Sequence, residues 1–111
     1  MSTLGSLLSM DTSAPCKFVR TKVGERIGEL CKEKRLSQSK LSAMISMDRS
    51  HLNQLIGGKS NVTLDVLVKI ADGLDVPLTD LFFGLGDVPP HQLVEYDGTE
   101  GAGATQARER S

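Results

Sequence analysis

The sequence lacks the features of a membrane protein, a secreted protein and a metal-dependent fold. No apolar run approaches the length of a bilayer span, and the start MSTLGSLLSM lacks the basic and continuous apolar parts of a signal peptide. Cys16 and Cys31 are the only cysteines, with no CxxC pair or nearby histidine cluster. We therefore expect a cytoplasmic protein with unpaired thiols, no membrane contact, no metal and no cofactor.

Catalytic arrangements are also missing. Neither His51 nor His91 has a Cys or Ser partner in a recognisable arrangement, and no glycine-rich phosphate loop follows a strand. The carboxylates are scattered over predicted helix surfaces. The sequence therefore predicts a protein that is not an enzyme.

The formal net charge of −1 hides an uneven distribution along the chain. Residues 17–86 contain eleven Lys or Arg against eight Asp or Glu, whereas residues 87–111 contain five acids against two arginines. Residues 1–16 contain only the acid Asp11. The acidity therefore lies in the two ends, and the middle of the chain is basic.

Composition divides the chain into three segments. Residues 1–16 have no clear hydrophobic period and end near Pro15, so we expect a flexible leader. Residues 87–111 are acidic and glycine-rich with little to bury, so we expect a disordered tail. A single domain is expected over residues 17–86, which can bury a modest core without a metal or disulfide.

The central segment predicts an all-α bundle of five helices, of which three come before residue 58. Apolar residues at helical spacing predict the first helix from about residue 18 to 34. Ser37 is the expected N-cap of the second helix, and Asp48 that of the third. The pair Gly57-Gly58 is expected to end the third helix, because glycine readily takes the left-handed conformation.

The last two predicted helices lie between residues 63 and 83. Thr63 is the expected N-cap of the fourth helix, and Gly73 is expected to stop it. The buried stripe of this helix is predicted to be Leu64, Leu67, Val68, Ile70 and Ala71. The fifth helix is expected over residues 79–83, where its apolar side chains would close the core.

Residues 37–57 have the pattern of a helix-turn-helix, a unit whose second helix enters the major groove of DNA. The outward face of that helix is predicted to present Arg49, Ser50, Asn53 and Gln54. Arginine can bond guanine through two hydrogen bonds, Asn and Gln can do the same for adenine, and serine can serve either base. The pattern therefore predicts a double-stranded DNA-binding protein.

At these residues the chain closely resembles the Cro and lambda-repressor type of helix-turn-helix, the xenobiotic-response-element (XRE) family. The resemblance runs from about Val23 to Phe82, through GERIGELCKEKRLSQ, SQSKLSAMISMDRSHLNQLIGGKSN and TLDVLVKIADGLDVPLTDLF. It implies a compact lambda-repressor-like DNA-binding domain and a transcriptional regulator. Within the family, the chain looks most like the short stand-alone regulators, which include controller proteins of restriction-modification systems.

The resemblance also implies roles for individual residues. Arg49, Ser50 and Gln54 fall at positions that usually contact bases, and Gln38 at one that contacts a backbone phosphate. Backbone or accessory contacts are expected from His51, Asn53, Lys59 and Asn61. Lys40 joins this second set as one of the basic residues that flank the unit and can neutralise phosphates.

The chain departs from the family pattern at three places. Ser46 stands where a turn glycine is usual, so we expect a strained or altered backbone there. Ile56 and Gly57 replace a common Glu and a polar residue, which removes a familiar polar contact at the end of the third helix. Ser42 replaces a small alanine between the two helices, a mild change in size.

The residues after the fourth helix predict pairing of two copies. Leu81, Phe82, Phe83 and Leu85 carry more apolar surface than one small bundle needs, so one face should close the core and the other form a dimer interface. The resemblance also implies a homodimer, which would read a near-palindromic operator.

A second function remains open at this point, that of an antitoxin-like module that binds a protein partner and also regulates its own operon. The partner-binding segment would be the QLVEY stretch at residues 92–96 in the acidic tail. The neighbouring genes, a toxin or a methyltransferase with a restriction enzyme, would discriminate between the two functions.

Overall fold

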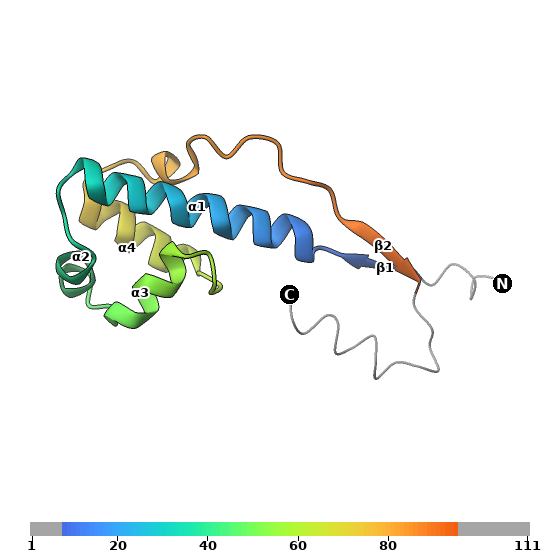
Figure 1. The fold of residues 1–111 in the computed structure, drawn as a ribbon, viewed down its shortest axis with the longest axis horizontal. Helices are drawn as coiled ribbons and strands as arrows, with labels where there is room; N and C mark the ends of the chain where they lie inside the picture. The colour runs from blue at the N-terminus through green and yellow to red at the C-terminus, as the bar shows by residue number, and fades with distance from the viewer. Residues whose placement is uncertain (1–7, 96–111) are drawn as a thin grey trace. The chain divides into compact units, whose positions relative to one another are not determined.

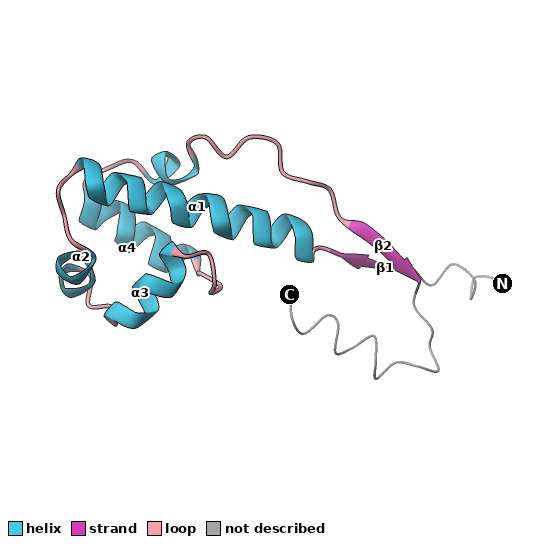
Figure 2. Cartoon of the chain, in the orientation of Figure 1, coloured by secondary structure: helices cyan, strands magenta, loops and turns pink. Residues whose placement is uncertain are grey.

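The computed structural model describes residues 8–95, in which helices dominate (Figures 1 and 2). In chain order the elements are strand β1 (Leu8–Asp11), helices α1 (Ser13–Glu33), α2 (Gln38–Met44), α3 (Arg49–Ile56) and α4 (Leu64–Leu74), the 3-10 helix η2 (Leu78–Phe82) and strand β2 (Gln92–Glu95). The chain divides into two compact units. One is residues 19–87, and the described part of the other combines residues 8–18 with residues 88–95.

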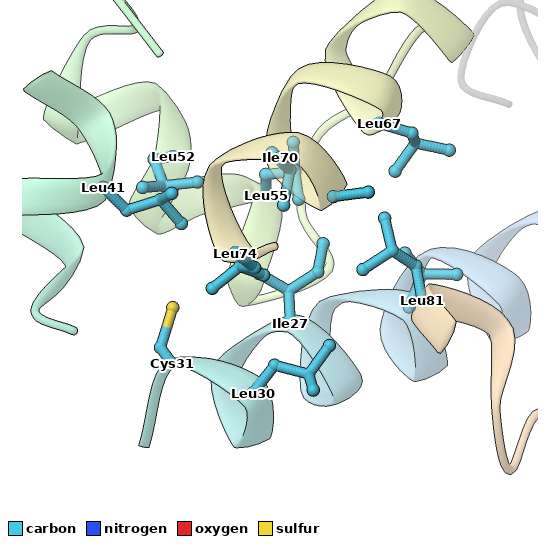
Figure 3. Packing of buried hydrophobic residues seen from close by; sticks show 12 residues of the cluster. Ile27, Leu30, Cys31, Leu41, Leu52, Leu55, Leu67, Ile70, Leu74 and Leu81 are labelled. Atoms are coloured by element: carbon cyan, nitrogen blue, oxygen red, sulfur yellow. The ribbon is translucent and has the colours of Figure 1, made fainter. Parts of the chain in front are cut away.

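The unit of residues 19–87 has one hydrophobic core, to which every helix contributes. Its largest fully buried side chains are Ile27 of α1, Leu41 of α2, Leu52 of α3, Ile70 and Leu74 of α4, and Leu81 of η2 (Figure 3). Burial of one such side chain contributes about 1.5–3 kcal/mol to the free energy of folding. The core therefore fixes the relative positions of the short helices, which would be only marginally helical alone.

Three N-caps that the sequence predicts are confirmed. The Ser37 hydroxyl accepts a hydrogen bond from the backbone N–H of Lys40 at 3.1 Å. The Asp48 carboxylate accepts from the N–H of His51 at 3.3 Å, and the Thr63 hydroxyl from that of Val66 at 3.2 Å. Each cap satisfies a donor that the first turn of a helix leaves without an intrahelical partner.

Helix α4 differs from its prediction in its end and in its buried face. It continues through Gly73 and ends at Leu74, and its C-cap Asp75 takes the left-handed conformation with φ 59°. Leu67, Ile70 and Ala71 are buried as predicted, but Leu64 is 72% and Val68 51% exposed. Leu64 and Val68 are four residues apart and therefore share a second face of the helix.

Gly73 allows α4 to pack closely against its neighbours, and its prediction as the residue that stops the helix is wrong. A Cβ atom at this position would lie 2.9 Å from side-chain carbons of Leu41 and of Ile45. Such distances are far inside van der Waals contact. The missing side chain therefore lets α4 approach α2 and the residue after it.

The prediction of five α-helices is wrong. Residues 8–95 contain four α-helices, and the predicted fifth is the single 3-10 helix η2. Pro77 precedes this element and Phe83 follows it in extended backbone conformation. Five residues between such boundaries allow only a short helical turn, which is where 3-10 geometry is common.

The prediction of a flexible leader is corrected for residues 8–16, nearly all of which lie in a strand or a helix. Helix α1 begins at Ser13 and not near residue 18, and residues 8–11 form β1. Pro15 lies in the first turn of α1, where its missing N–H costs no hydrogen bond. A proline near a helix start is therefore no sign that the helix begins after it. Residues 1–7 of the leader lie outside the described residues.

The all-α prediction and part of the tail prediction are corrected by a two-stranded antiparallel sheet. Strand β1 pairs with β2 so that Leu8 lies opposite Glu95 and Asp11 opposite Gln92. The tail was expected to be disordered, but its residues 92–95 pair with residues 8–11 of the leader. Residues 96–111 of the tail, which include Tyr96, lie outside the described residues.

Candidate nucleic-acid interface

Helix α3 presents the polar face that its sequence predicts. Leu52 and Leu55 are 0% and 3% exposed and anchor the helix on the core, whereas the other face is solvent-accessible. The exposed residues are Arg49, Ser50, His51, Asn53 and Gln54. The first turn of α3 contains no acidic residue, and Asp48 lies just before it as the cap. The accessible face therefore combines the guanidinium of Arg49 with hydroxyl, amide and imidazole groups that can form hydrogen bonds.

Helix α2 packs beside α3 and positions the start of that face. Leu41 and Ser42 are buried, and the Ser42 hydroxyl donates to the carbonyl of Ser39 at 2.8 Å. Ser42, which replaces the family alanine, thus has a hydrogen-bond partner for its hydroxyl within α2. Gln38 is half-buried at the first position of α2, and Lys40 is exposed.

The turn between α2 and α3 has the altered backbone expected at Ser46. Its φ is 57°, in the left-handed region that favours glycine. The turn is held by a hydrogen bond of 2.8 Å from the N–H of Met47 to the carbonyl of Ser42. Ser46 therefore takes the left-handed conformation that a glycine would adopt at this position of the turn.

The end of α3 is held by packing instead of the polar contact that the family usually has there. Ile56 is partly buried against the core. A Cβ atom at Gly24 of α1 would lie 2.4 Å from the Ile56 carbonyl oxygen and 2.6 Å from that of Leu55. The bare backbone of α1 at Gly24 therefore lets the last turn of α3 lie directly against it.

The loop after α3, residues 57–63, carries two more predicted contact residues. Lys59 and Asn61 are both exposed. Gly58 has φ 74°, and a Cβ atom there would lie 2.9 Å from the Cα of Thr21 in α1. Asn61 is not free, because its side-chain oxygen accepts a hydrogen bond from Arg20 Nη1 at 3.3 Å.

Arg20 is a residue that the sequence analysis missed. It lies 41 positions before Asn61, and no local pattern connects the two. Its only sequence signal is a positive charge near the start of the basic central segment. The contact arises from the packing of Gly58 on α1, which brings the loop to this helix.

The four residues predicted to form a dimer interface differ in their exposure to solvent. Leu81 is 0% exposed and belongs to the core, so its predicted place at a dimer surface is corrected. Phe82 packs against the core with part of its surface accessible, and Leu85 is half-buried. Phe83 is 71% exposed. Phe83 is therefore the member with the most surface available to a second copy.

Arg26, also missed from the sequence, fixes the position of this segment. Its Nε donates to the carbonyl oxygen of Asp80 at 2.9 Å, and its guanidinium lies 5.0 Å from the centre of the Phe83 ring. The same side chain pairs with Glu29 at 3.3 Å and with Glu33 at 3.8 Å. One face of the Phe83 ring is therefore supported by a cation.

The remaining groups considered from the sequence are a buried thiol, the potential metal ligands and the longer helices. Cys31 is buried, and burial raises the pKa of its thiol because it disfavours the charged thiolate. Residues 8–95 contain no cluster of three or more potential metal ligands. Within the same range, no helix combines the length and apolar character needed to cross a membrane.

The sequence matches known helix-turn-helix proteins over most of this unit. Residues 27–81 match the HTH_3 family model, described as helix-turn-helix. The chain is 38% identical over 65 residues to control protein C.MunI of a Mycoplasma species, a match that covers 58% of this chain and 88% of that protein.

Solved structures of two controller proteins are also similar. The restriction-modification controller protein C.AhdI from Aeromonas hydrophila has 36% sequence identity and a TM-score of 0.56, over 57% of this chain and 96% of that chain. The controller protein C.Esp1396I, solved as a tetramer with its natural 35 base-pair operator, has 28% identity and a TM-score of 0.56, over 61% and 90% of the two chains. These relatives are controller proteins, so the antitoxin-like alternative is not favoured.

Proposed function

Because the chain belongs to the HTH_3 helix-turn-helix family, we propose that it is a controller-type transcriptional regulator that binds double-stranded operator DNA as a homodimer. The family membership confirms the XRE-type resemblance of the sequence. The protein acts by binding and not by catalysis, and it works in the cytoplasm, where its operator is accessible.

The observation that carries the proposal is the exposed face of α3. Arg49 lies in the first turn, directly after the cap Asp48, and recognition helices contact bases through their N-terminal residues. Arg49 supplies two directed donors for a guanine, and Gln54 a donor and an acceptor for an adenine. Ser50 can serve either base from the same turn.

Contacts to the DNA backbone would come from residues on both sides of this face. Gln38 and Lys40 lie in the first turn of α2, and Lys59 and Asn61 in the loop after α3. His51 and Asn53 are exposed on α3 beside the base-reading residues. Such contacts set register and orientation but carry no sequence information.

Selection of bound sequences from a random duplex pool tests the proposal. We expect enrichment of a near-palindrome whose half-sites lie about one helical turn apart, because a two-fold dimer presents α3 twice. A shuffled version of the selected site serves as the control. If no sequence is enriched over the shuffled pool, the protein is not a sequence-specific DNA-binding protein.

Replacing Phe83 with lysine should give monomers that remain helical. The Phe83 ring is the most exposed of the predicted interface residues, and a two-fold axis would place two added charges close together. Sedimentation gives the mass and circular dichroism the helix content. Met44→Lys, at another exposed apolar residue, is the matched control and should stay dimeric. An unchanged mass for Phe83→Lys would remove Phe83 from the interface.

A further inference from the structure

Arg20 and Asn61 form a hydrogen-bonded pair at one edge of the candidate interface. Arg20 Nη1 donates to Asn61 Oδ1 at 3.3 Å, which joins α1 to the loop after α3. The close approach of Gly58 to Thr21 sets this arrangement, because it leaves no room for a side chain between the loop and the helix. The pair is therefore built into the packing of residues 57–63 on α1.

The hydrogen bond determines which atoms of the pair remain available. Asn61 accepts through Oδ1, so its Nδ2 group, with two donors, is turned away from Arg20. Arg20 still has Nη2 and Nε, and no ion pair engages its guanidinium among residues 8–95. Asn61 is exposed and Arg20 half-exposed. The accessible atoms are thus donors with a positive charge and no carboxylate partner.

We infer that Arg20 and Asn61 together hold a backbone phosphate of the operator beyond the bases that α3 reads. Guanidinium and amide donors match the oxygens of a phosphodiester, and Lys59 adds a second charge to the same loop. Helix α1 then contributes directly to DNA binding through Arg20. The inference rests on the proposed function and extends it to a helix outside the helix-turn-helix.

The test is the affinity of Arg20→Gln for the selected operator and its single-base variants over a range of salt concentrations. We expect a loss on the order of tenfold per subunit at about 0.1 M salt, with a salt slope smaller by about 0.9 per lost phosphate contact. Base preference should be unchanged, because a phosphate contact carries no sequence information. Lys69→Gln, an equal loss of charge on the exposed surface of α4, should keep the wild-type slope.

Two further variants separate phosphate binding from support of the loop. Arg20→Lys keeps the charge and should retain the salt slope with part of the affinity. Asn61→Asp replaces the hydrogen bond to Arg20 with an ion pair, which neutralises the charge of Arg20. This variant should keep the melting temperature of the protein but bind every DNA sequence more weakly. If Arg20→Gln destabilises the fold, Asn61→Asp decides, because an unchanged affinity and salt slope for that variant would overturn the inference.

An unchanged affinity and slope for Arg20→Gln would overturn the inference and leave the proposed function intact. Weaker binding with a changed base preference would also overturn it, because Arg20 would then act through the position of α3. Failure of the unmodified protein to enrich any sequence contradicts the proposed function itself. The two failures are therefore distinguishable.

Discussion

Replacing Arg49 with alanine is expected to weaken binding to the preferred site by about 1–3 kcal/mol and to remove preference at one base pair in each half-site. The arginine lies in the first turn of α3, and no hydrogen bond or ion pair within residues 8–95 holds its side chain. Its donors are therefore available to a guanine. The measurement is affinity for a panel of single-base variants.

Two other substitutions calibrate this result. Gln54→Ala should relax preference at a different base pair, because Gln54 lies more than one turn further along the same helix. Lys40→Ala should lower the affinity for all DNA sequences alike. It should also reduce the salt dependence of the affinity by about one phosphate contact per subunit. If Arg49→Ala also lowers the affinity for all DNA sequences alike and leaves the base preference intact, α3 does not read bases through Arg49.

Replacing Gly24 with alanine is expected to lower the free energy of unfolding by about 3 kcal/mol, a large fraction of the stability of a small domain. The new Cβ would lie 2.4 Å from the Ile56 carbonyl oxygen, and a backbone atom cannot turn away as a side chain can. The end of α3 must move instead. Operator affinity should therefore fall together with stability, which urea denaturation measures.

Gly28→Ala is the matched control one turn further along α1. A Cβ atom there would lie 3.4 Å from a methyl carbon of Ile56, which is a tolerable contact with a side chain. Alanine favours the helix by up to about 1 kcal/mol over glycine, so this variant should be as stable as the unmodified protein or more so. Equal stability of the two alanine variants would contradict the close approach of α1 and α3.

The features that the sequence predicted well depend on local signals. The caps Ser37, Asp48 and Thr63 are formed within three residues of each helix start, so nearby residues suffice to identify them. The exposed face of α3 follows from the burial of Leu52 and Leu55, which helical periodicity already indicates. The base-reading candidates on that face could therefore be named without a structure.

The features that were missed depend on contacts between distant parts of the chain. Gly73 resembles a helix stop until its packing against Leu41 is known, and Asp75 gives no strong signal as a left-handed end. The contact of Arg20 with Asn61 likewise requires the packing of the loop on α1. Periodicity within one segment contains no information about such neighbours.

The pairing of β1 with β2 also depends on distant residues, since nothing in either four-residue segment identifies the other. Exposed apolar residues occur in both strands, but short segments of this kind are equally compatible with a loop. The 3-10 form of η2 was missed for another reason. Its short apolar sequence is compatible with an α-helical turn and with a 3-10 turn. Only the extended backbone on both sides distinguishes the two.

The antiparallel register of β1 and β2 makes the described chain suitable for circular permutation. Leu8 and Glu95 lie opposite each other at one end of the ladder, and neighbouring strands are about 5 Å apart. A tight two-residue turn such as Asn-Gly would join them into a hairpin with the natural twist. New chain termini could then be placed in a surface loop of residues 19–87. Another protein could be fused to the domain at that loop.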